Sequence, residues 1–336
     1  MFVSSLLAIC FAAPIPKGER EGTILLVRSS PLPVELIVMR SGGTIDKRFE
    51  PKGIEGRIAA VRLSPSAAKA LLICPITAPA PLPGGGRIWP PSSCYLVDLE
   101  KPDEPAKLIY ERLTYAIRVA WAPDSKSIYF SDLDPEKVNA AIAAKPDDPL
   151  PYRSWTIDLG TLKKEPLKLP AGHIVHDISN DGKTLLTGTM PNVTKTTDYQ
   201  KMRGYLVPRN TLVPKLLLDS EFSPTKLSPD GSRAIGYRRH MDEAGRSRIQ
   251  YLVVDADGSG ETLVREPPAA MSMFATPTFA NNGRSVAYIW YERVDLPEGQ
   301  GQTIRYNLSV ADRTGSNMKV LYKTEPGQSV TIFDWR

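Results

Sequence analysis

The chain has 336 residues, 42% of them hydrophobic and 24% charged, which is enough apolar material for a large core and excludes a disordered or collagen-like protein. Proline is abundant, with 31 residues, and this disfavours an architecture of long helices because proline removes a helix hydrogen bond. The net charge of +5 comes from scattered basic residues, and the densest group, residues 238–240, is interpreted as a solvated loop, so we expect no nucleic-acid binding.

Residues 1–13, MFVSSLLAICFAA, contain no charged side chain and are typical of the apolar part of a signal peptide. The segment is too short to cross a bilayer, which takes about 20 apolar residues. We therefore expect a periplasmic or secreted mature chain, residues 14–336, without an integral membrane span. Two alternatives stay open. One is a lipoprotein attached through Cys10, because residues 7–10 are similar to a lipoprotein cleavage box, and the other is a cytoplasmic protein with a misassigned start.

Cys74 and Cys94 are the only cysteines after residue 13. Cys74 ends an apolar run and Cys94 precedes another, with a loop rich in Pro and Gly between them. Two antiparallel strands that meet at the base of this loop would bring the thiols within bonding distance. In an oxidising compartment we predict a Cys74–Cys94 disulfide that stabilises the fold by about 3 kcal/mol. The alternative is two buried free thiols, as expected in the cytoplasm.

One phrase recurs along the chain: an alternating apolar strand, a turn of the type Ser-Pro-Asp-Gly, and a second strand. In such a turn proline presets φ, aspartate or asparagine bonds back to its own backbone, and glycine adopts a positive φ without strain. The turn positions from Pro65 to Asn281 are on average 54 residues apart. The phrase occupies residues 57–76, 116–133, 173–190, 223–239 and 274–293.

Each phrase is followed by a second strand pair with its own turn, and a unit of four short antiparallel strands at this spacing is typical of a β-propeller blade. At the N-terminal end, residues 21–27 align with residues 181–187, the second strand of a repeat. At the C-terminal end, Trp335 aligns with Trp121 of a first strand. We therefore predict one all-β domain, a six-bladed propeller in which a single blade is completed by both termini, so that no sheet edge stays open.

The segments WAPDSK (121–126), LSPDGS (227–232) and VDADGSG (254–260) resemble the repeats of TolB-like six-bladed propellers, which are also described as WD-repeat-like. The resemblance extends over residues 17–336 and implies the propeller fold, with no expected counterpart of the α/β domain that precedes the propeller in TolB. The same repeat occurs in periplasmic binding proteins and in the propellers of some serine peptidases. The resemblance therefore implies the fold without choosing between these roles.

The loops between second and third strands are long and variable, whereas the Pro-Asp-Gly turns are short in every repeat. Since the second-to-third loops all lie on one face of a propeller, their enlargement indicates the binding face. In residues 132–151, Asp134-Pro135-Glu136 before an Ala-rich run predicts one short helix that ends at Pro146. These loops occupy residues 77–93, 132–151, 190–201, 239–247 and 292–302.

The leading hypothesis is an exported, monomeric and non-catalytic scaffold that binds a protein or a cell-surface polymer through this long-loop face, without a cofactor. Trp, Tyr and Arg dominate the energetics of protein interfaces, so residues of these types on the long-loop face are the candidate contacts. They are Arg87, Trp89, Tyr152, Tyr199, Arg238, Arg239, Tyr291 and Arg293.

Other motifs are interpreted as structural. Residues 255–266 nearly match the spacing of a calcium loop, but the residues before them alternate like a strand, so a hairpin turn is expected. His173 and His176 would point to opposite faces of a strand, and we expect no metal site. No Gly-x-Ser-x-Gly elbow is present, which disfavours a serine hydrolase.

The rival hypothesis is an enzyme of the lactonase or lyase type, with its acid and base in the central channel. His176, Asp177 and Asp334 lie on or next to predicted innermost strands and would be its participants. A structural role for Asp177 is an equal alternative.

Overall fold

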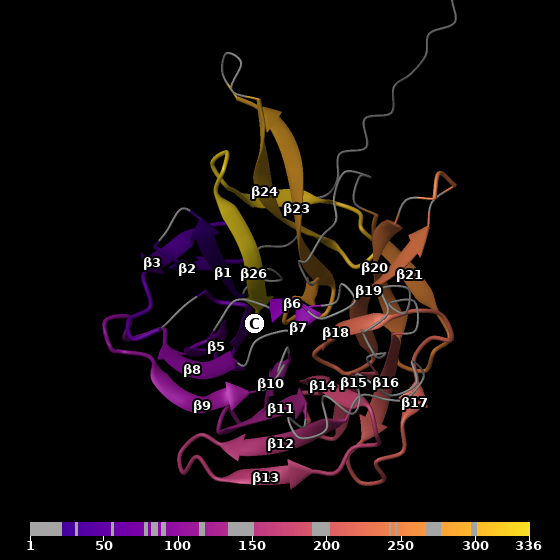
Figure 1. Ribbon diagram of the computed structural model, residues 1–336. Helices are drawn as coiled ribbons and strands as arrows, with labels where there is room; N and C mark the ends of the chain where they lie inside the picture. The colour runs from indigo at the N-terminus through magenta and orange to yellow at the C-terminus, as the bar shows by residue number, and fades with distance from the viewer. Residues whose placement is uncertain are drawn as a thin grey trace, which may run out of the picture.

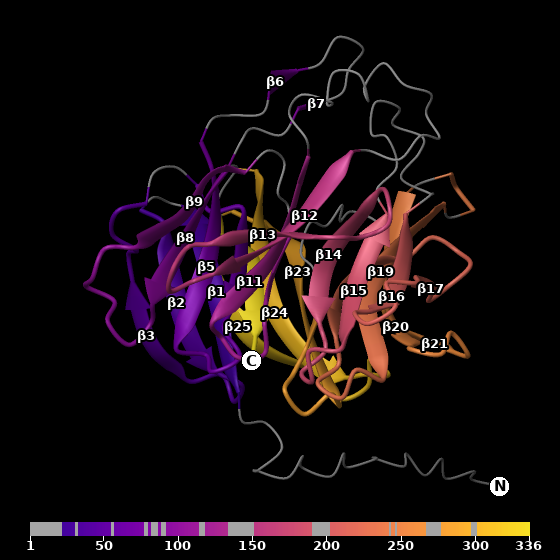
Figure 2. The same ribbon diagram turned by 90° about the horizontal axis from the view of Figure 1, so that it is seen from below.

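The computed structural model describes residues 22–30, 33–54, 57–76, 80–81, 87–88, 92–113, 118–133, 151–189, 202–241, 243–245, 247–266, 277–296 and 301–336. Their regular structure is entirely β: six four-stranded antiparallel sheets stand around a central axis, with one small hairpin beside them (Figures 1 and 2). The predicted six-bladed propeller is confirmed. Within these residues no helix is long and apolar enough to cross a membrane. Residues 1–13 and the predicted helix lie outside the described part.

Each blade has one strand at the channel and three successive strands outside it. From the innermost strand outward, blade 1 consists of β26 (Ser329–Trp335), β1 (Thr23–Ser30), β2 (Glu35–Arg40) and β3 (Ile45–Phe49). Blade 2 consists of β4 (Ala60–Leu63), β5 (Lys69–Pro75), β8 (Ser92–Asp98) and β9 (Lys107–Leu113), and the hairpin of β6 (Ala80–Pro81) and β7 (Arg87–Ile88) is inserted between β5 and β8. Blade 3 consists of β10 (Val119–Trp121), β11 (Ser127–Leu133), β12 (Tyr152–Asp158) and β13 (Lys164–Leu167).

Blades 4 to 6 have the same order of strands. Blade 4 consists of β14 (His173–Ile178), β15 (Thr184–Thr189), β16 (Arg203–Pro208) and β17 (Lys215–Leu216). Blade 5 consists of β18 (Ser223–Leu227), β19 (Arg233–Met241), β20 (Ser247–Asp255) and β21 (Glu261–Arg265). Blade 6 consists of β22 (Thr278–Phe279), β23 (Ser285–Asp295), β24 (Gln302–Asp312) and β25 (Lys319–Lys323).

Blade 1 joins the two ends of the described chain. β26 pairs antiparallel with β1, with Ile24 opposite Trp335, and backbone hydrogen bonds link Thr23 to Arg336 in both directions. Successive innermost strands contact one another around the whole ring, from β4 through to β26. The prediction that both ends complete one blade is confirmed, and the ring has no open edge between its first and last strands.

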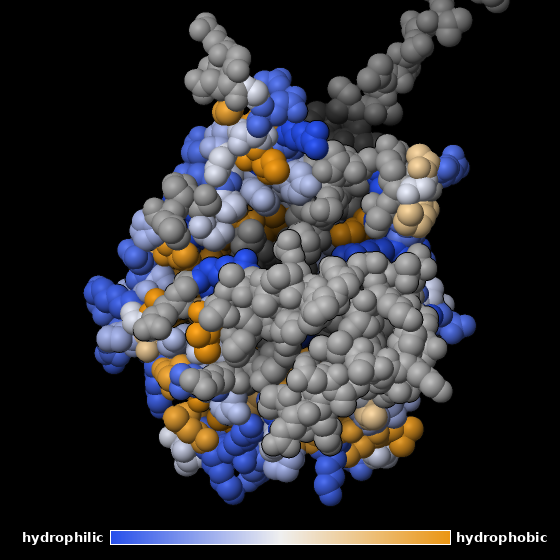
Figure 3. Space-filling model, viewed as in Figure 1, coloured by the Kyte–Doolittle hydropathy of each residue, from blue (hydrophilic) through white to orange (hydrophobic). Residues whose placement is uncertain are grey.

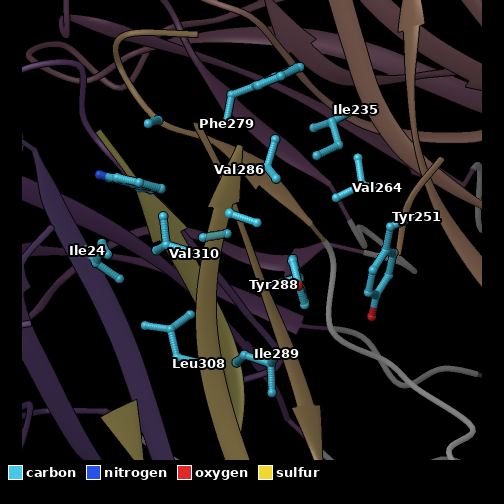
Figure 4. Close-up of a cluster of buried hydrophobic side chains, with 14 of the residues drawn as sticks. Ile24, Ile235, Tyr251, Val264, Phe279, Val286, Tyr288, Ile289, Leu308 and Val310 are labelled. Atoms are coloured by element: carbon cyan, nitrogen blue, oxygen red, sulfur yellow. The ribbon is translucent and has the colours of Figure 1, made fainter. Parts of the chain in front are cut away.

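The hydrophobic core lies between the blades. Each second strand is covered on both faces, which explains the continuous apolar runs in β1 and β5. In β5, Leu72 packs toward blade 1 and Leu71 packs toward blade 3, because successive side chains of a strand point to opposite faces. The largest cluster joins blades 5, 6 and 1, and includes Tyr251 and Tyr288 (Figure 4).

The predicted disulfide is wrong in this structure, where Cys74 and Cys94 are both buried free thiols. Their strands do pair, as predicted, but Cys74 stands opposite Ser93 and Cys94 opposite Ile73. This offset of one residue sends the two side chains to opposite faces of blade 2, Cys74 toward blade 1 and Cys94 toward blade 3. Burial raises the pKa of the Cys74 thiol to about 12. The cysteines therefore give no support to an oxidising compartment.

The short turns between first and second strands share one backbone hydrogen bond in five blades, and in four of them an Asp or Asn side chain adds a second. In blade 5, for example, the Gly231 N–H donates to the Ser228 carbonyl, and the Ser232 N–H donates to Asp230 Oδ1 at 3.0 Å. Asp124, Asp181 and Asn282 accept in the same way, as the turn chemistry predicted. The position equivalent to Gly231 has a positive φ in all five turns, and it is occupied by Ala67, Ser125, Gly182, Gly231 and Gly283.

Replacing Ala67 by glycine should raise the free energy of unfolding by about 0.5 kcal/mol. Ala67 has a φ of 56°, where an L-residue is strained by roughly 1 kcal/mol. Glycine relieves this strain, but its unfolded state is more flexible, which offsets part of the gain in stability. Urea unfolding of A67G measures the change. Gly182→Ala is the matched control, since Gly182 has a φ of 71° and should lose about 1 kcal/mol. A lower stability of A67G contradicts the strain argument.

Candidate functional site

The innermost strands place one equivalent residue per blade around the central channel. It is the residue before the last of each strand, such as Asp177 in β14 and Asp334 in β26. Asp177, Lys226 and Asp334 are buried, and each needs partners because an isolated buried charge is strongly unfavourable. In the order of blades 1 to 6 the six residues are Asp334, Arg62, Ala120, Asp177, Lys226 and Thr278.

The two aspartates connect neighbouring blades in the same way. The Leu63 N–H of blade 2 donates to Asp334 Oδ2 of blade 1 at 2.8 Å. The Leu227 N–H of blade 5 donates to Asp177 Oδ2 of blade 4 at 2.9 Å. Each carboxylate thus satisfies the backbone amide at the end of the next innermost strand, which is a structural use of these groups.

Two ion pairs cross the channel. Lys226 Nζ of blade 5 donates to Asp334 Oδ1 of blade 1 at 2.7 Å and also to the Trp335 carbonyl. Arg336 follows β26, and its Nη2 lies 3.6 Å from Asp177 Oδ1 of blade 4, on the opposite side of the ring. The C-terminal label lies near the centre of the ring in Figure 1, in agreement with this crossing. The pairs connect blades 1, 4 and 5 through the channel.

Electrostatics keep Asp334 ionised. Burial acts to raise the pKa of its carboxyl, but the charges of Lys226, Arg336 and Arg62 and the Lys226 hydrogen bond outweigh it and lower that pKa to about 2. For Lys226 the balance is reversed. Burial, followed by the charge of Arg336, lowers its pKa to about 8 although Asp334 and Asp177 act in the opposite direction.

His176 stands at a β-bulge, where the pairing of β14 with β15 shifts between Val175 and Asp177. Arg118 Nε donates to His176 Nδ1 at 3.3 Å. Burial lowers the pKa of His176 well below its usual value, and the charges of Arg118 and Arg62 add to this effect. The imidazole is therefore neutral.

Of the residues named by the enzyme hypothesis, Asp177 and Asp334 lie on the innermost strands with ion pairs across the channel, whereas the His176 ring lies against Gly188 of β15. Asp177 and Asp334 each accept a backbone N–H and face a cation from another blade. His176 accepts from Arg118 and stays neutral. None of the three is placed as an acid–base pair, so the contacts do not favour that chemistry.

Sequence reasoning missed three basic members of the channel, Arg62, Lys226 and Arg336. A usable signal was present in the repeat itself. Aligning the innermost strands gives a column that holds Arg62, Asp177, Lys226 and Asp334, and charges at one position of otherwise apolar strands indicate a shared polar environment.

The long-loop face is extended by two hairpins. β19–β20 and β23–β24 have strands of 9 and 11 residues, and their pairing continues to Met241 opposite Ser247 and to Asp295 opposite Gln302. The outer strands β21 and β25 have 5 residues each. Both hairpins therefore continue beyond their outer strands, and β23–β24 projects at the top of Figure 1, where Figure 3 shows mixed hydrophilic and hydrophobic side chains.

Four of the predicted binding residues lie on these hairpins. Tyr291 stands opposite Tyr306 with ring centroids 5.8 Å apart, and Arg293 is exposed two residues further on. Arg238 Nε donates to Gln250 at 2.8 Å and its Nη1 donates to Glu261 at 3.0 Å, so this guanidinium is held within blade 5. Arg239 is half-buried on the same strand.

Of the other predicted contacts, only Tyr152 has a side chain within the described part of the chain. Tyr152 begins β12, and the charge of Arg118 acts on its phenol, whose pKa is raised by burial. Arg87 belongs to β7, but its side chain lies outside the described part, as do Trp89 and Tyr199 entirely.

The calcium-like segment is a hairpin turn between β20 and β21, as predicted. The Gly258 N–H donates to the Asp255 carbonyl at 2.9 Å, and Asp255 pairs with Arg233. Glu266, the last residue of the supposed loop, instead accepts from Arg248 and Gln250.

No protein-family model and no curated protein matches this sequence. Among solved structures, TolB from Acinetobacter baumannii aligns over 95% of this chain and 67% of its own, with a TM-score of 0.63 and 17% identical residues. A putative TolB from Agrobacterium tumefaciens aligns over 92% and 91%, with a TM-score of 0.55 and 13% identity. The fold is that of a TolB-like propeller.

This chain also aligns with a chain from a structural study of two prolyl endopeptidases, over 93% of its own residues and 50% of that chain, with a TM-score of 0.53 and 13% identity. It thus spans about half the length of that enzyme. At these identities the likeness concerns the fold, so a role has to be argued from the residues of this chain.

Proposed function

We propose that this TolB-like propeller is an exported scaffold that binds a protein or a cell-surface polymer through its long-loop face. The observation that supports this most directly is the pair of hairpins that extend blades 5 and 6 beyond their outer strands. Rigid paired strands present side chains with little loss of conformational entropy on binding. The hairpins present Tyr and Arg, the residue types that contribute most to interfaces.

Tyr291 and Arg293 are the best candidates for the contact. Tyr291 is half-buried against Tyr306, so its ring is held in place before a partner binds. Arg293 is exposed on the same strand, where Ile304 stands opposite and is exposed too. An ordered aromatic ring beside an exposed guanidinium and an aliphatic side chain is a favourable arrangement for a hot spot.

Export is the second part of the proposal and depends on residues 1–13. If these residues are a cleaved signal peptide, the protein purified from its host begins at Pro14. N-terminal sequencing of that protein decides the point, and a chain that retains residues 1–13 contradicts cleavage.

Replacing Tyr291 and Arg293 together by alanine should weaken partner binding at least tenfold without unfolding the propeller. The measurement is affinity capture from an envelope and secreted-protein extract, with the bound partner quantified for each variant. The matched control is Lys126→Ala with Lys183→Ala, two exposed residues beside the short turns of the opposite face. A partner retained equally by all three proteins contradicts the assigned face, and no partner with any of them contradicts the scaffold.

A further inference from the structure

Among the described residues, the channel contains more basic than acidic side chains. Arg62, Lys226 and Arg336 lie with two carboxylates, Asp177 and Asp334. Each carboxylate already uses one oxygen for a backbone N–H. The pKa of Lys226 is lowered to about 8 by burial and then by Arg336, against the attraction of both aspartates. Three basic side chains thus stand with two acidic ones among the described residues, so one positive charge has no carboxylate of its own.

The Arg336 guanidinium has more N–H donors than the described residues around it have acceptors for them. Its side chain is 10% exposed, and its Nε is buried without a hydrogen-bond partner among the described residues. Its Nη2 lies 3.6 Å from Asp177 Oδ1, which is longer than a hydrogen bond. A guanidinium has five N–H donors in a planar fork, so most of this group remains available for another acceptor.

Arg62 precedes Leu63, whose N–H donates to Asp334, and among the described residues Arg62 forms no ion pair. Its Nη1 donates to the carbonyl of the preceding residue, Val61, at 3.2 Å. Its positive charge contributes to the lowered pKa of both Asp334 and His176. Arg62 is partly exposed, whereas the side chains of Lys226 and Arg336 are 9% and 10% exposed.

His176 has a further buried donor without a partner, but its Nε2 lies against β15 and not at the channel, since a Cβ added to Gly188 would be 2.6 Å from it. An arginine only donates hydrogen bonds, so the contact from Arg118 Nε requires an unprotonated Nδ1. The neutral ring then holds its proton on Nε2, which is buried without an acceptor among the residues described. Because this nitrogen faces Gly188, His176 is not a contact for a ligand in the channel, whereas the buried Arg336 Nε is a candidate contact.

We propose that the central channel binds a small oxyanion, a carboxylate or a phosphate, between Arg62 and Arg336. The planar guanidinium fork matches the paired oxygens of such ions and forms two parallel hydrogen bonds with them. The site is separate from the hairpins of the long-loop face. Its test is therefore independent of the test of the scaffold proposal.

The test is calorimetric titration of the full chain with sodium phosphate and, in a second arm, with sodium acetate, both at constant ionic strength set with sodium chloride. We expect saturable binding of at least one oxyanion, and the ratio of the two affinities distinguishes a phosphate from a carboxylate site. Arg62→Gln should weaken binding at least tenfold, and Arg62→Lys should recover part of the loss. Arg40→Gln is the matched control, because Arg40 lies on β2 with its side chain 73% exposed.

Arg336→Lys gives an independent measurement. Lysine keeps the charge that faces Asp177 but lacks Nε and the fork, so we expect weaker binding in a protein that still folds. The proposal is overturned if neither oxyanion binds saturably to the wild-type chain. It is also overturned if Arg336→Lys, or a folded Arg62→Gln, binds both probes as tightly as Arg40→Gln does.

Discussion

Replacing Asp334 by asparagine should lower the free energy of unfolding by about 3–5 kcal/mol at pH 7, the usual loss when one partner of a buried ion pair is removed. The carboxylate is buried and accepts from Lys226 Nζ at 2.7 Å and from the Leu63 N–H at 2.8 Å. Asparagine retains an oxygen for Leu63 but no charge for Lys226. The loss therefore comes mainly from an ammonium left unpaired inside the channel.

A double variant separates this effect from simple misfit. In D334N with Lys226→Met both charges are removed, and methionine has nearly the length of the lysine stem. The double variant should be more stable than D334N alone, because no buried charge is left without a partner. Urea unfolding at pH 7 measures all three proteins. A D334N protein within about 0.5 kcal/mol of the wild type would falsify the assigned role.

The ion pair of Asp334 with Lys226 should also make the stability of the protein depend on pH in the acid range. The pKa of Asp334 is about 2 in the fold against 3.8 ordinarily, so ionised Asp334 favours the folded state. This contribution, roughly 2 kcal/mol, is complete above about pH 5 and is lost as the pH falls toward 2. The difference in stability between the wild type and D334N should therefore shrink between pH 4 and pH 2. A difference that stays constant over this interval contradicts the pKa argument.

The sequence was informative where a structural choice is local. The turn after each innermost strand is determined by four residues, and Asp124, Asp181, Asp230 and Asn282 make the backbone contacts that their residue types predict. The repetition of these turns gave the blade, and the match of Trp335 with Trp121 gave the closed ring. Both tryptophans are buried between blades.

The register between paired strands could not be predicted from local sequence in this way. That β5 pairs with β8 followed from the apolar runs on either side of a loop, but a shift of one residue decides whether Cys74 faces Cys94 or Ser93. The loop between the strands is long, with β6 and β7 inside it, and no short turn fixes the pairing. The predicted disulfide failed for this reason.

Only the acidic residues of the channel could be predicted from the sequence. Asp177 and Asp334 could be placed near the axis because they stand on innermost strands, whereas their partners depend on which blades face each other across the ring. Lys226 lies 108 residues from Asp334 in sequence, and Arg336 reaches blade 4 from blade 1. Such distances are set by closure of the six blades, so side-chain roles in the channel follow from the assembled ring and not from any local motif.

Replacing Gly236 by alanine should destabilise the protein by about 2–3 kcal/mol, although alanine in a strand is ordinarily the better residue. Gly236 lies on β19, where its φ is not positive, so its backbone gives alanine no strain. The conflict is steric. An added Cβ would lie 2.8 Å from the Phe222 ring and closer still to the Ser223 carbonyl, which belongs to the backbone of β18.

The backbone contact decides the sign of the effect. Phe222 is fully buried where blade 4 meets blade 5, and the Ser223 carbonyl stands on the innermost strand that also contains Lys226, so neither yields without moving β18. Gly42→Ala is the matched control, since nothing lies within 4 Å of the Cβ it would add and its stability should change by less than about 0.5 kcal/mol. Urea unfolding compares the two variants. Equal stability of G236A and G42A would show that blades 4 and 5 are packed less closely than these contacts require.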